Sequence, residues 1–202
     1  DIAEPLAFYA DARERGADFD RGIRAAVARV LVSPAFLFRS EHDPADLPVG
    51  SSHPISDTEL ASRLSFFLWS SIPDDELLEL AEQGRLRDAE VLETQVRRMI
   101  ADERSHALVN NFTGQWLQLR NLELRVKPDL LEFDDFDHNL RMAFRRETQL
   151  LFEHVLREDE SVHELLTADY TYVNERLARH YGIPGVYGVR FRRVDVADPN
   201  RY

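Results

Sequence analysis

The chain of 202 residues carries a formal net charge of −12, contains no cysteine and is 44% hydrophobic and 31% charged. This length and composition are those of a folded protein that buries a sizeable core. The acidic balance, with no basic stripe to offset it, excludes nucleic acid as a partner. The absence of cysteine excludes Cys-ligated zinc, iron–sulfur clusters and the Cys-x-x-Cys-His attachment of c-type haem, and the longest apolar stretches are too short to span a membrane.

The first 45 residues are predicted to form a helical segment. A short helix over residues 5–15 ends at Gly16, and a second helix ends before Pro34. Apolar residues at the i, i+4, i+7 and i+8 positions give the second helix one stripe: Ile23, Val27, Val30 and Leu31. We expect this stripe to need a partner that covers it. Because the chain opens on Asp1 rather than methionine, we expect residues to precede it in the full polypeptide.

Residues 46–54, rich in proline, glycine and serine, are interpreted as a linker. The capping box of Ser56 and Glu59 then predicts a helix start. This helix has a wide apolar face made of Leu60, Leu64, Phe66, Phe67, Leu68 and Trp69. Further helices are predicted over residues 73–84, from Asp88 and from Ser105. We interpret Trp69 and Trp116 as core residues rather than as a platform for sugar rings.

Residues 121–137 are predicted to be irregular and to precede a long helix over residues 139–157. Short helices are predicted over residues 161–166 and 174–180. Residues 185–202 lack helical periodicity, and Val189, Phe191 and Val194 suggest a strand that pairs outside this chain. The predicted fold is mainly all-α, a bundle of about seven to nine helices, with an irregular or short-strand tail. Residues 55–191 form its main domain, and residues 192–202 lead toward further domains.

Glu147 is the most notable polar candidate, because it shares the apolar stripe of the long helix with His154. A buried carboxylate needs a partner. Arg63, on the other strongly apolar helix, is one candidate, and the alternatives are Arg24, Arg29 and Arg39. Glu147 and His154 lie about two turns, roughly 10 Å, apart along the helix, so they do not chelate one ion together. A buried ion pair is therefore favoured over a metal site.

Asp134, Asp137 and His138 offer oxygen and nitrogen ligands that suit a hard or borderline cation. The alternative is that they are a solvated helix start with Asp137 as N-cap. The sequence lacks the residue order of a calcium loop, which favours the helix start.

Two pairs, Glu103 with His106 and Glu160 with His163, have the Glu-x-x-His spacing of di-iron bundles. Both fall at predicted helix joints, so we interpret them as exposed joint residues. The sequence contains no Gly-x-Ser-x-Gly elbow, Walker loop, Gly-x-Gly-x-x-Gly or His-Glu-x-x-His, and it therefore gives no support to those enzyme classes.

Several motifs resemble domain of unknown function 1592, a family found in large planctomycete and myxobacterial proteins. They are ELASRLSFFLWSSIPD at 59–74, NFTGQWL at 111–117, ADYTYVNERLA at 168–178 and HYGIP at 180–184. Upstream, LVSPAFLFR at 31–39 is similar to the end of the small helical domain that usually precedes this family.

The resemblance implies an exported, multidomain protein of the cell envelope or beyond, with neighbouring cytochrome-c-like haem domains and carbohydrate-binding modules. It supplies no catalytic residues and implies no cofactor in this chain, so any haem belongs to another domain. Our leading hypothesis is a non-catalytic helical module that docks other domains of the same polypeptide. The alternative is an enzymatic or metal-binding half-site, acting on a polymer or in redox chemistry and completed by neighbouring domains.

Overall fold

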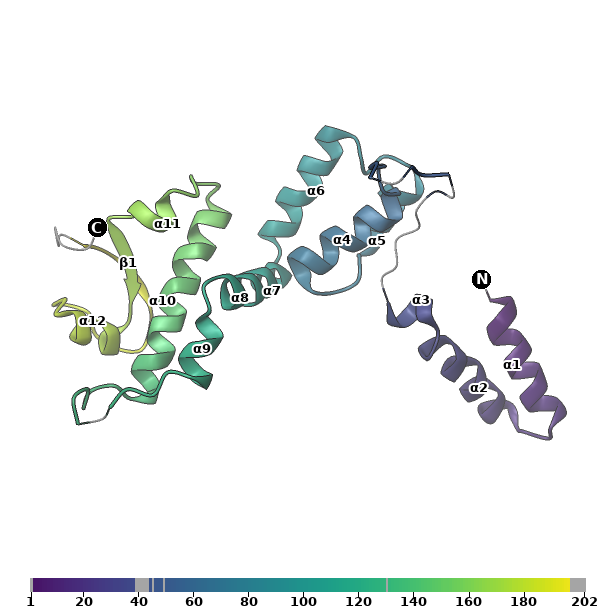
Figure 1. Ribbon diagram of the computed structural model, residues 1–202, viewed down its shortest axis with the longest axis horizontal. Helices are drawn as coiled ribbons and strands as arrows, with labels where there is room; N and C mark the ends of the chain where they lie inside the picture. Colours follow the sequence, from purple (N-terminus) through teal and green to yellow (C-terminus); the bar gives the residue numbers. More distant parts are fainter. Residues whose placement is uncertain (1, 39–43, 45, 49, 130, 197–202) are drawn as a thin grey trace. The chain divides into compact units, whose positions relative to one another are not determined.

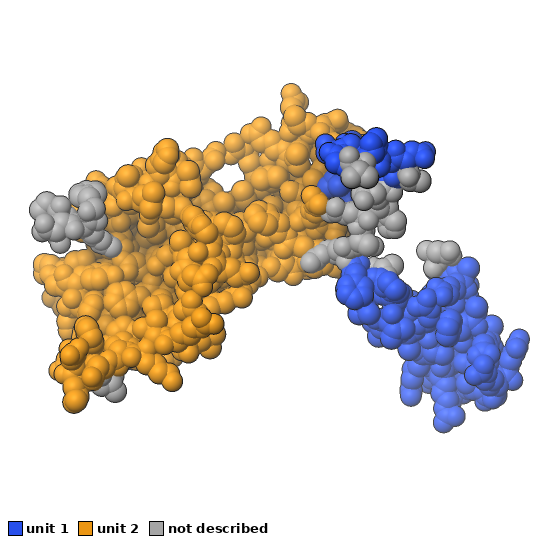
Figure 2. Space-filling model, in the orientation of Figure 1, with its two compact units in different colours: residues 1–59 blue, residues 60–202 orange. Residues whose placement is uncertain are grey.

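The structure is a computed structural model that describes residues 2–38, 44, 46–48, 50–129 and 131–196. The chain divides into two compact units, residues 1–59 and residues 60–202, which Figure 2 shows in different colours. The division falls in the first turn of a helix, shortly after the linker predicted at 46–54. The mainly α-helical fold with a short-strand tail is confirmed. Among the described residues, no helix combines the length and apolar character needed to cross a membrane.

The first unit contains a hairpin of α1 (Ala3–Glu14) and α2 (Phe19–Leu31), followed by the short α3 (Pro34–Leu37). Asp18 caps α2 by accepting from the N–H of Arg21 at 2.8 Å. Arg29 bonds to Glu4 of α1 at 2.6 and 2.9 Å. Gly22 is the one buried residue among the described residues of these three helices.

Within the second unit, α4 (Asp57–Trp69), which begins at the unit boundary, packs with α5 (Asp75–Glu82) and α6 (Ala89–Ala101). The predicted capping box is confirmed by two reciprocal bonds. The carboxylate of Glu59 accepts from the main-chain N–H of Ser56 at 2.8 Å, and Ser56 Oγ accepts from the main-chain N–H of Glu59 at 3.2 Å. The buried core here is Ala61, Leu68, Trp69, Leu77, Ala81, Leu86, Met99 and Leu108. Phe67, expected on this face, is 60% exposed.

The helix predicted from Ser105 is broken into short pieces. They are the 3-10 turn η1 (Glu103–Ser105), α7 (His106–Leu108), the π-helical η2 (Val109–Thr113), α8 (Gly114–Trp116) and α9 (Leu119–Leu124). The wider π turn shifts the helical phase, so a 3.6-residue stripe does not stay on one face. Trp116 is therefore 54% exposed, which makes the prediction that it lies in the core wrong.

The long helix α10 (His138–Arg157) begins one residue before its predicted start. Its first half packs into a second core made of Leu140, Ala143, Val173, Leu177, Ala178 and Val186. Leu156, near its end, packs against the core of α4–α6. The helix therefore joins the two cores of the second unit. In Figure 1 it lies between α9 on one side and β1 on the other.

After α11 (Glu164–Thr167), β1 (Tyr170–Val173) precedes α12 (Glu175–Tyr181). The strand β2 (Arg192–Asp195) pairs antiparallel with β1, with Tyr170 opposite Asp195 and Val173 opposite Arg192. The expectation that the tail strand pairs outside this chain is therefore wrong: its partner is a strand that the sequence pattern did not reveal, because β1 lies between two short helices.

Candidate functional site

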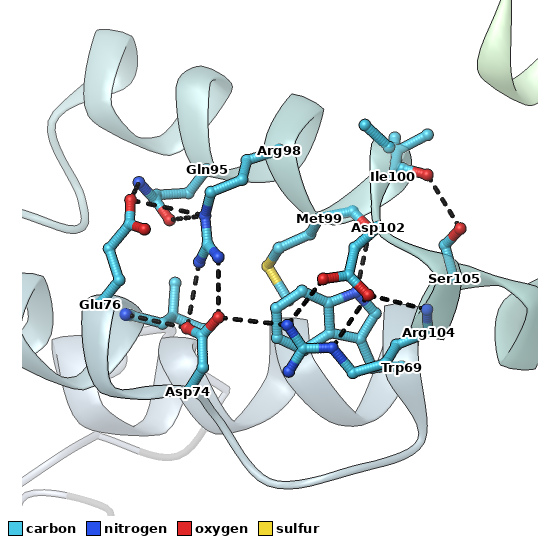
Figure 3. Close-up of polar contacts among 12 residues, drawn as sticks. Trp69, Asp74, Glu76, Gln95, Arg98, Met99, Ile100, Asp102, Arg104 and Ser105 are labelled. Carbon is cyan, nitrogen blue, oxygen red and sulfur yellow. Dashed lines mark hydrogen bonds and ion pairs between the residues drawn. The ribbon is translucent and has the colours of Figure 1, made fainter.

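Trp69 anchors the joint between α4 and α6. Its side chain is 3% exposed, and its indole Nε1 donates to the main-chain oxygen of Met99 at 2.9 Å (Figure 3). The guanidinium of Arg104 lies 3.4 Å from the centre of the indole ring, a cation–π contact. Trp69 thus lies in the core, as predicted.

Asp74 is the carboxylate at the centre of the polar contacts around this joint. It caps α5 by accepting from the N–H of Leu77 at 3.1 Å, and it accepts two bonds from Arg98, at 2.7 and 3.1 Å (Figure 3). The bonds from Arg98 lower the pKa of Asp74. Arg104, which lies over the indole ring, bonds to Asp102 and lowers the pKa of that carboxyl to about 2. Carboxylates held ionised by arginines are weak proton acceptors, and the bonds of this network join the start of α5 to the end of α6.

A second network fastens α10 to the joint after α6. Glu153 Oε1 accepts from Arg157 Nε at 3.1 Å and lies 3.2 Å from His106 Nδ1. Arg157 also donates to Ser105 Oγ at 3.0 Å and to the main-chain oxygen of Ile100 at 3.2 Å. These bonds satisfy a carbonyl at the end of α6.

Three residues of the two Glu-x-x-His pairs contact residues outside their own motifs. His106 contacts Glu153, while Glu160 lies 3.5 Å from His154 and accepts from the hydroxyl of Tyr170 at 3.2 Å. His163 contacts Ser161 instead. Both pairs are therefore joint residues, in agreement with the interpretation made from their positions.

Glu147 is buried at 8% exposure, as its position on the stripe predicts. Its described hydrogen bonds come from hydroxyl groups: Thr171 Oγ1 of β1 donates to Oε1, and the phenol of Tyr181 in α12 donates to Oε2 at 2.7 Å. Sequence reasoning considered only charged partners. It missed these two because they follow Glu147 by 24 and 34 positions and meet it only when β1 and α12 fold onto α10.

The arginines considered as partners of Glu147 differ in their burial and bonding. Arg63 has an exposed side chain on α4. Arg24 is exposed on α2, and Arg29 bonds to Glu4. Arg39 lies outside the described residues.

His154 has surroundings of its own near the end of α10. Its ring packs edge-on against Tyr170 and tilted against Tyr172, and its Nε2 lies 3.4 Å from Arg193. Burial, followed by the bond to Glu160, raises the pKa of Tyr170 to about 12. Burial also raises the pKa of Tyr172. Both phenols therefore stay protonated near neutral pH and do not act as bases there.

The acidic residues before α10 serve the helix start. Asp137 is the N-cap, accepting from the N–H of Leu140 at 2.6 Å, and Asp135 lies 2.9 Å from His180 Nδ1. Asp134 and His138 are exposed. In the part of the chain that the structure describes, no group of three His, Cys, Asp or Glu side chains is placed to hold a metal ion.

The main apolar feature on the first unit is the stripe of α2. Ile23, Val27, Val30 and Leu31 are 42%, 49%, 40% and 48% exposed. The aromatic residues Phe8 and Phe19 of the same hairpin are also exposed. Contiguous exposed apolar side chains of this kind are typical of interaction surfaces.

Two family models match the chain at separate places. The model of PSD4, described as a protein of unknown function (DUF1592), matches residues 55–183, and that of PSD5, a protein of unknown function (DUF1595), matches residues 1–41. The first match covers more than half of the chain, which therefore belongs to the PSD4 family and confirms the resemblance. No curated protein and no solved structure matches the chain.

Proposed function

We propose that this PSD4-family chain is a non-catalytic helical docking module that packs against other folded domains of a larger polypeptide. The observation that carries the proposal is the exposed stripe of α2. The match of residues 1–41 to a different family from residues 55–183 supports it further, because it indicates a chain assembled from modules.

The physical case rests on how little the α1–α2 hairpin buries by itself. Helices of 12 and 13 residues are marginal in water unless a face is packed. Burying the half-exposed stripe of four aliphatic residues would contribute about 4 kcal/mol, at about 1 kcal/mol for each side chain. A partner that packs against this face would therefore stabilise the hairpin, and the same burial would contribute to the binding of that partner.

The partner that fits is an apolar helical surface. The i, i+4, i+7 and i+8 spacing of the stripe forms the ridge that packs into the groove of another helix. The ion pair of Arg29 with Glu4 already joins the two helices of the hairpin, so the apolar stripe is the feature left for recognition.

The wider setting is proposed from the family resemblance. It is an exported polypeptide with cytochrome-c-like and carbohydrate-binding domains as the docked partners. Because this chain has no cysteine for covalent attachment of c-type haem, such a haem would be held by a neighbouring domain. We propose no cofactor for the chain itself.

The alternative is an enzymatic or metal-binding half-site completed by neighbouring domains. It has less support, because Arg63 is exposed while Glu147 and His154 bond to different elements. Elemental analysis after incubation with iron, zinc, manganese and calcium separates the two functions. Stoichiometric metal that is lost in Glu147→Gln would favour the half-site.

The docking proposal is tested by hydrogen exchange of residues 19–31, measured in this chain and in the full-length polypeptide. We expect slower exchange in the full-length polypeptide, and Val27→Asp should abolish the difference. Ala28→Asp is the matched control, because it places the same charge at an exposed position of α2 off the stripe. Equal exchange in both polypeptides, or equal effects of the two substitutions, would contradict docking through this face.

A further inference from the structure

The run of short helical pieces between α6 and α9 carries a group of aromatic side chains at its surface. The ring centre of Phe112 in η2 lies 5.4 Å from that of Trp116 in α8 and 5.7 Å from that of Phe152 in α10. Phe112 and Trp116 are exposed. These three residues are called the aromatic patch. The patch belongs to the second unit, whereas the α2 stripe belongs to the first, so it does not depend on the docking proposal.

The π-helical turn η2, which packs against α10, presents the patch (Figure 1). Such turns occur frequently at functional sites. Gln149 of α10 donates to Asn110 Oδ1 at 3.0 Å, and Asn111 donates to Ser70 Oγ at 2.9 Å. These bonds hold η2 to two other elements. A ligand that binds the patch therefore does not first have to order the backbone that carries it.

Trp116 differs from the buried tryptophan in its indole donor. Nε1 of Trp69 donates to the main-chain oxygen of Met99. Among the described residues, by contrast, neither the indole N–H of Trp116 nor the side-chain amide of Gln115 has a hydrogen-bond partner. Both side chains are exposed. An exposed indole with its donor unused presents an apolar face and a polar edge to a ligand.

The segment that carries most of the patch is polar but uncharged. In a chain that is 31% charged, residues 107–119 contain no charged residue and no histidine. They do contain four amide side chains, those of Asn110, Asn111, Gln115 and Gln118. A wholly apolar partner would bury amides without satisfying them, which costs free energy. A neutral ligand rich in hydroxyl groups would supply both donors and acceptors for them.

A sugar chain has the chemistry that fits these features. A pyranose ring has an apolar face of C–H groups that stacks on an aromatic ring, and hydroxyls at its edge that bond to amides and to an indole N–H. The exposure of Trp116 also removes the reason for interpreting it as a core residue rather than as a platform for sugar rings. The net charge of −12 disfavours an anionic polymer. We propose that the aromatic patch binds a neutral polysaccharide, with sugar rings stacked on Trp116 and Phe112 and hydroxyl groups bonded to Gln115.

The test uses the indole N–H signals of the full chain in proton–nitrogen NMR spectra, because the chain has two tryptophans and one of them is buried. Trp116→Phe assigns the signals by removing one. The neutral probes are cellohexaose, xylohexaose and maltohexaose, and the anionic probe is trigalacturonate. We expect at least one neutral probe to shift the Trp116 signal saturably, with a Kd on the order of 1 mM, and to leave the Trp69 signal unchanged. Glucose and trigalacturonate should bind about tenfold more weakly or less.

Three variants locate the site, and backbone amide shifts of residues 110–118 report binding to each. Trp116→Ala should weaken binding of the neutral probe about tenfold or more. Gln115→Ala keeps the rings and should weaken it about threefold, the loss of a single hydrogen bond. Tyr187→Ala is the matched control, because it removes an exposed aromatic ring outside the patch, and should bind as the native chain does. The two substituted patch residues are exposed, so we expect far-ultraviolet circular dichroism to show native helix content in both.

Three results would overturn the proposal. They are no binding of any neutral probe at about 10 mM, equal shifts of the two indole signals, or native binding by Trp116→Ala. The first would leave the aromatic patch to a protein partner instead.

Discussion

The indole Nε1 of Trp69 donates to the main-chain oxygen of Met99 at 2.9 Å, and this bond joins the last residue of α4 to the end of α6. Both residues are buried, at 3% and 0% exposure. Arg104 covers the face of the indole ring. The Trp69 side chain therefore contacts both the buried core and the charged residues at the surface.

We expect Trp69→Phe to lower the free energy of unfolding by about 1–3 kcal/mol, because it removes the donor from a buried carbonyl. Trp116→Phe is the matched control, since Trp116 is 54% exposed. It should change the free energy by less than about 0.5 kcal/mol. Urea unfolding followed by far-ultraviolet circular dichroism measures both. Similar losses in the two variants would show that the Trp69 bond does not hold the joint.

Features that depend on neighbouring residues were predictable from the sequence. The capping box of Ser56 and Glu59 and the cap by Asp137 need only a few consecutive positions, and both are confirmed. The burial of Leu140 and Glu147 follows from the 3.6-residue period of α10. The mainly α-helical fold follows from many such local signals.

Features that depend on tertiary structure were not predictable. Thr171 and Tyr181 show no sequence signal as partners of Glu147, because an uncharged hydroxyl is suitable at many positions. Tyr170 and Val173 belong to a four-residue strand, too short for its alternation to be distinguished from the helices beside it. The π turn that exposes Trp116 likewise leaves no mark in the periodicity.

The ion pair of Asp102 with Arg104 predicts a pH dependence of stability. The pKa of Asp102 is lowered from 3.8 to about 2 in the folded chain, mainly by its hydrogen bond from Arg104. A carboxyl group with a depressed folded pKa stabilises the fold above its unfolded pKa, and this contribution is lost as the pH falls through the folded value. The stabilisation of the fold by Asp102 is therefore lost between about pH 4 and pH 2.

We expect Asp102→Asn to lower Tm at neutral pH and to reduce the further fall of Tm between pH 4 and pH 2. The comparison is Glu132→Gln, which removes the same charge from an exposed loop residue and should keep the native profile in that range. Thermal unfolding at several pH values measures these curves. If the curves of native chain and Asp102→Asn run parallel down to pH 2, the pair with Arg104 is not the source of the dependence.

The contact of Gly22 with Tyr9 determines how closely α1 and α2 approach. A Cβ atom added at Gly22 would lie 2.7 and 2.8 Å from two ring carbons of Tyr9, closer than side chains pack. In isolation, replacing a mid-helix glycine by alanine gains about 1 kcal/mol of helix propensity, whereas overpacking costs about 1–3 kcal/mol. We expect the overpacking to exceed the gain, so that Gly22→Ala increases hydrogen exchange in residues 3–31.

The second variant, Gly22→Ala combined with Tyr9→Ala, removes the ring and leaves the propensity gain, so its exchange in α2 should be slower than that of Tyr9→Ala alone. Slower exchange in Gly22→Ala itself, with Tyr9 present, would mean that α1 and α2 do not rely on this close approach.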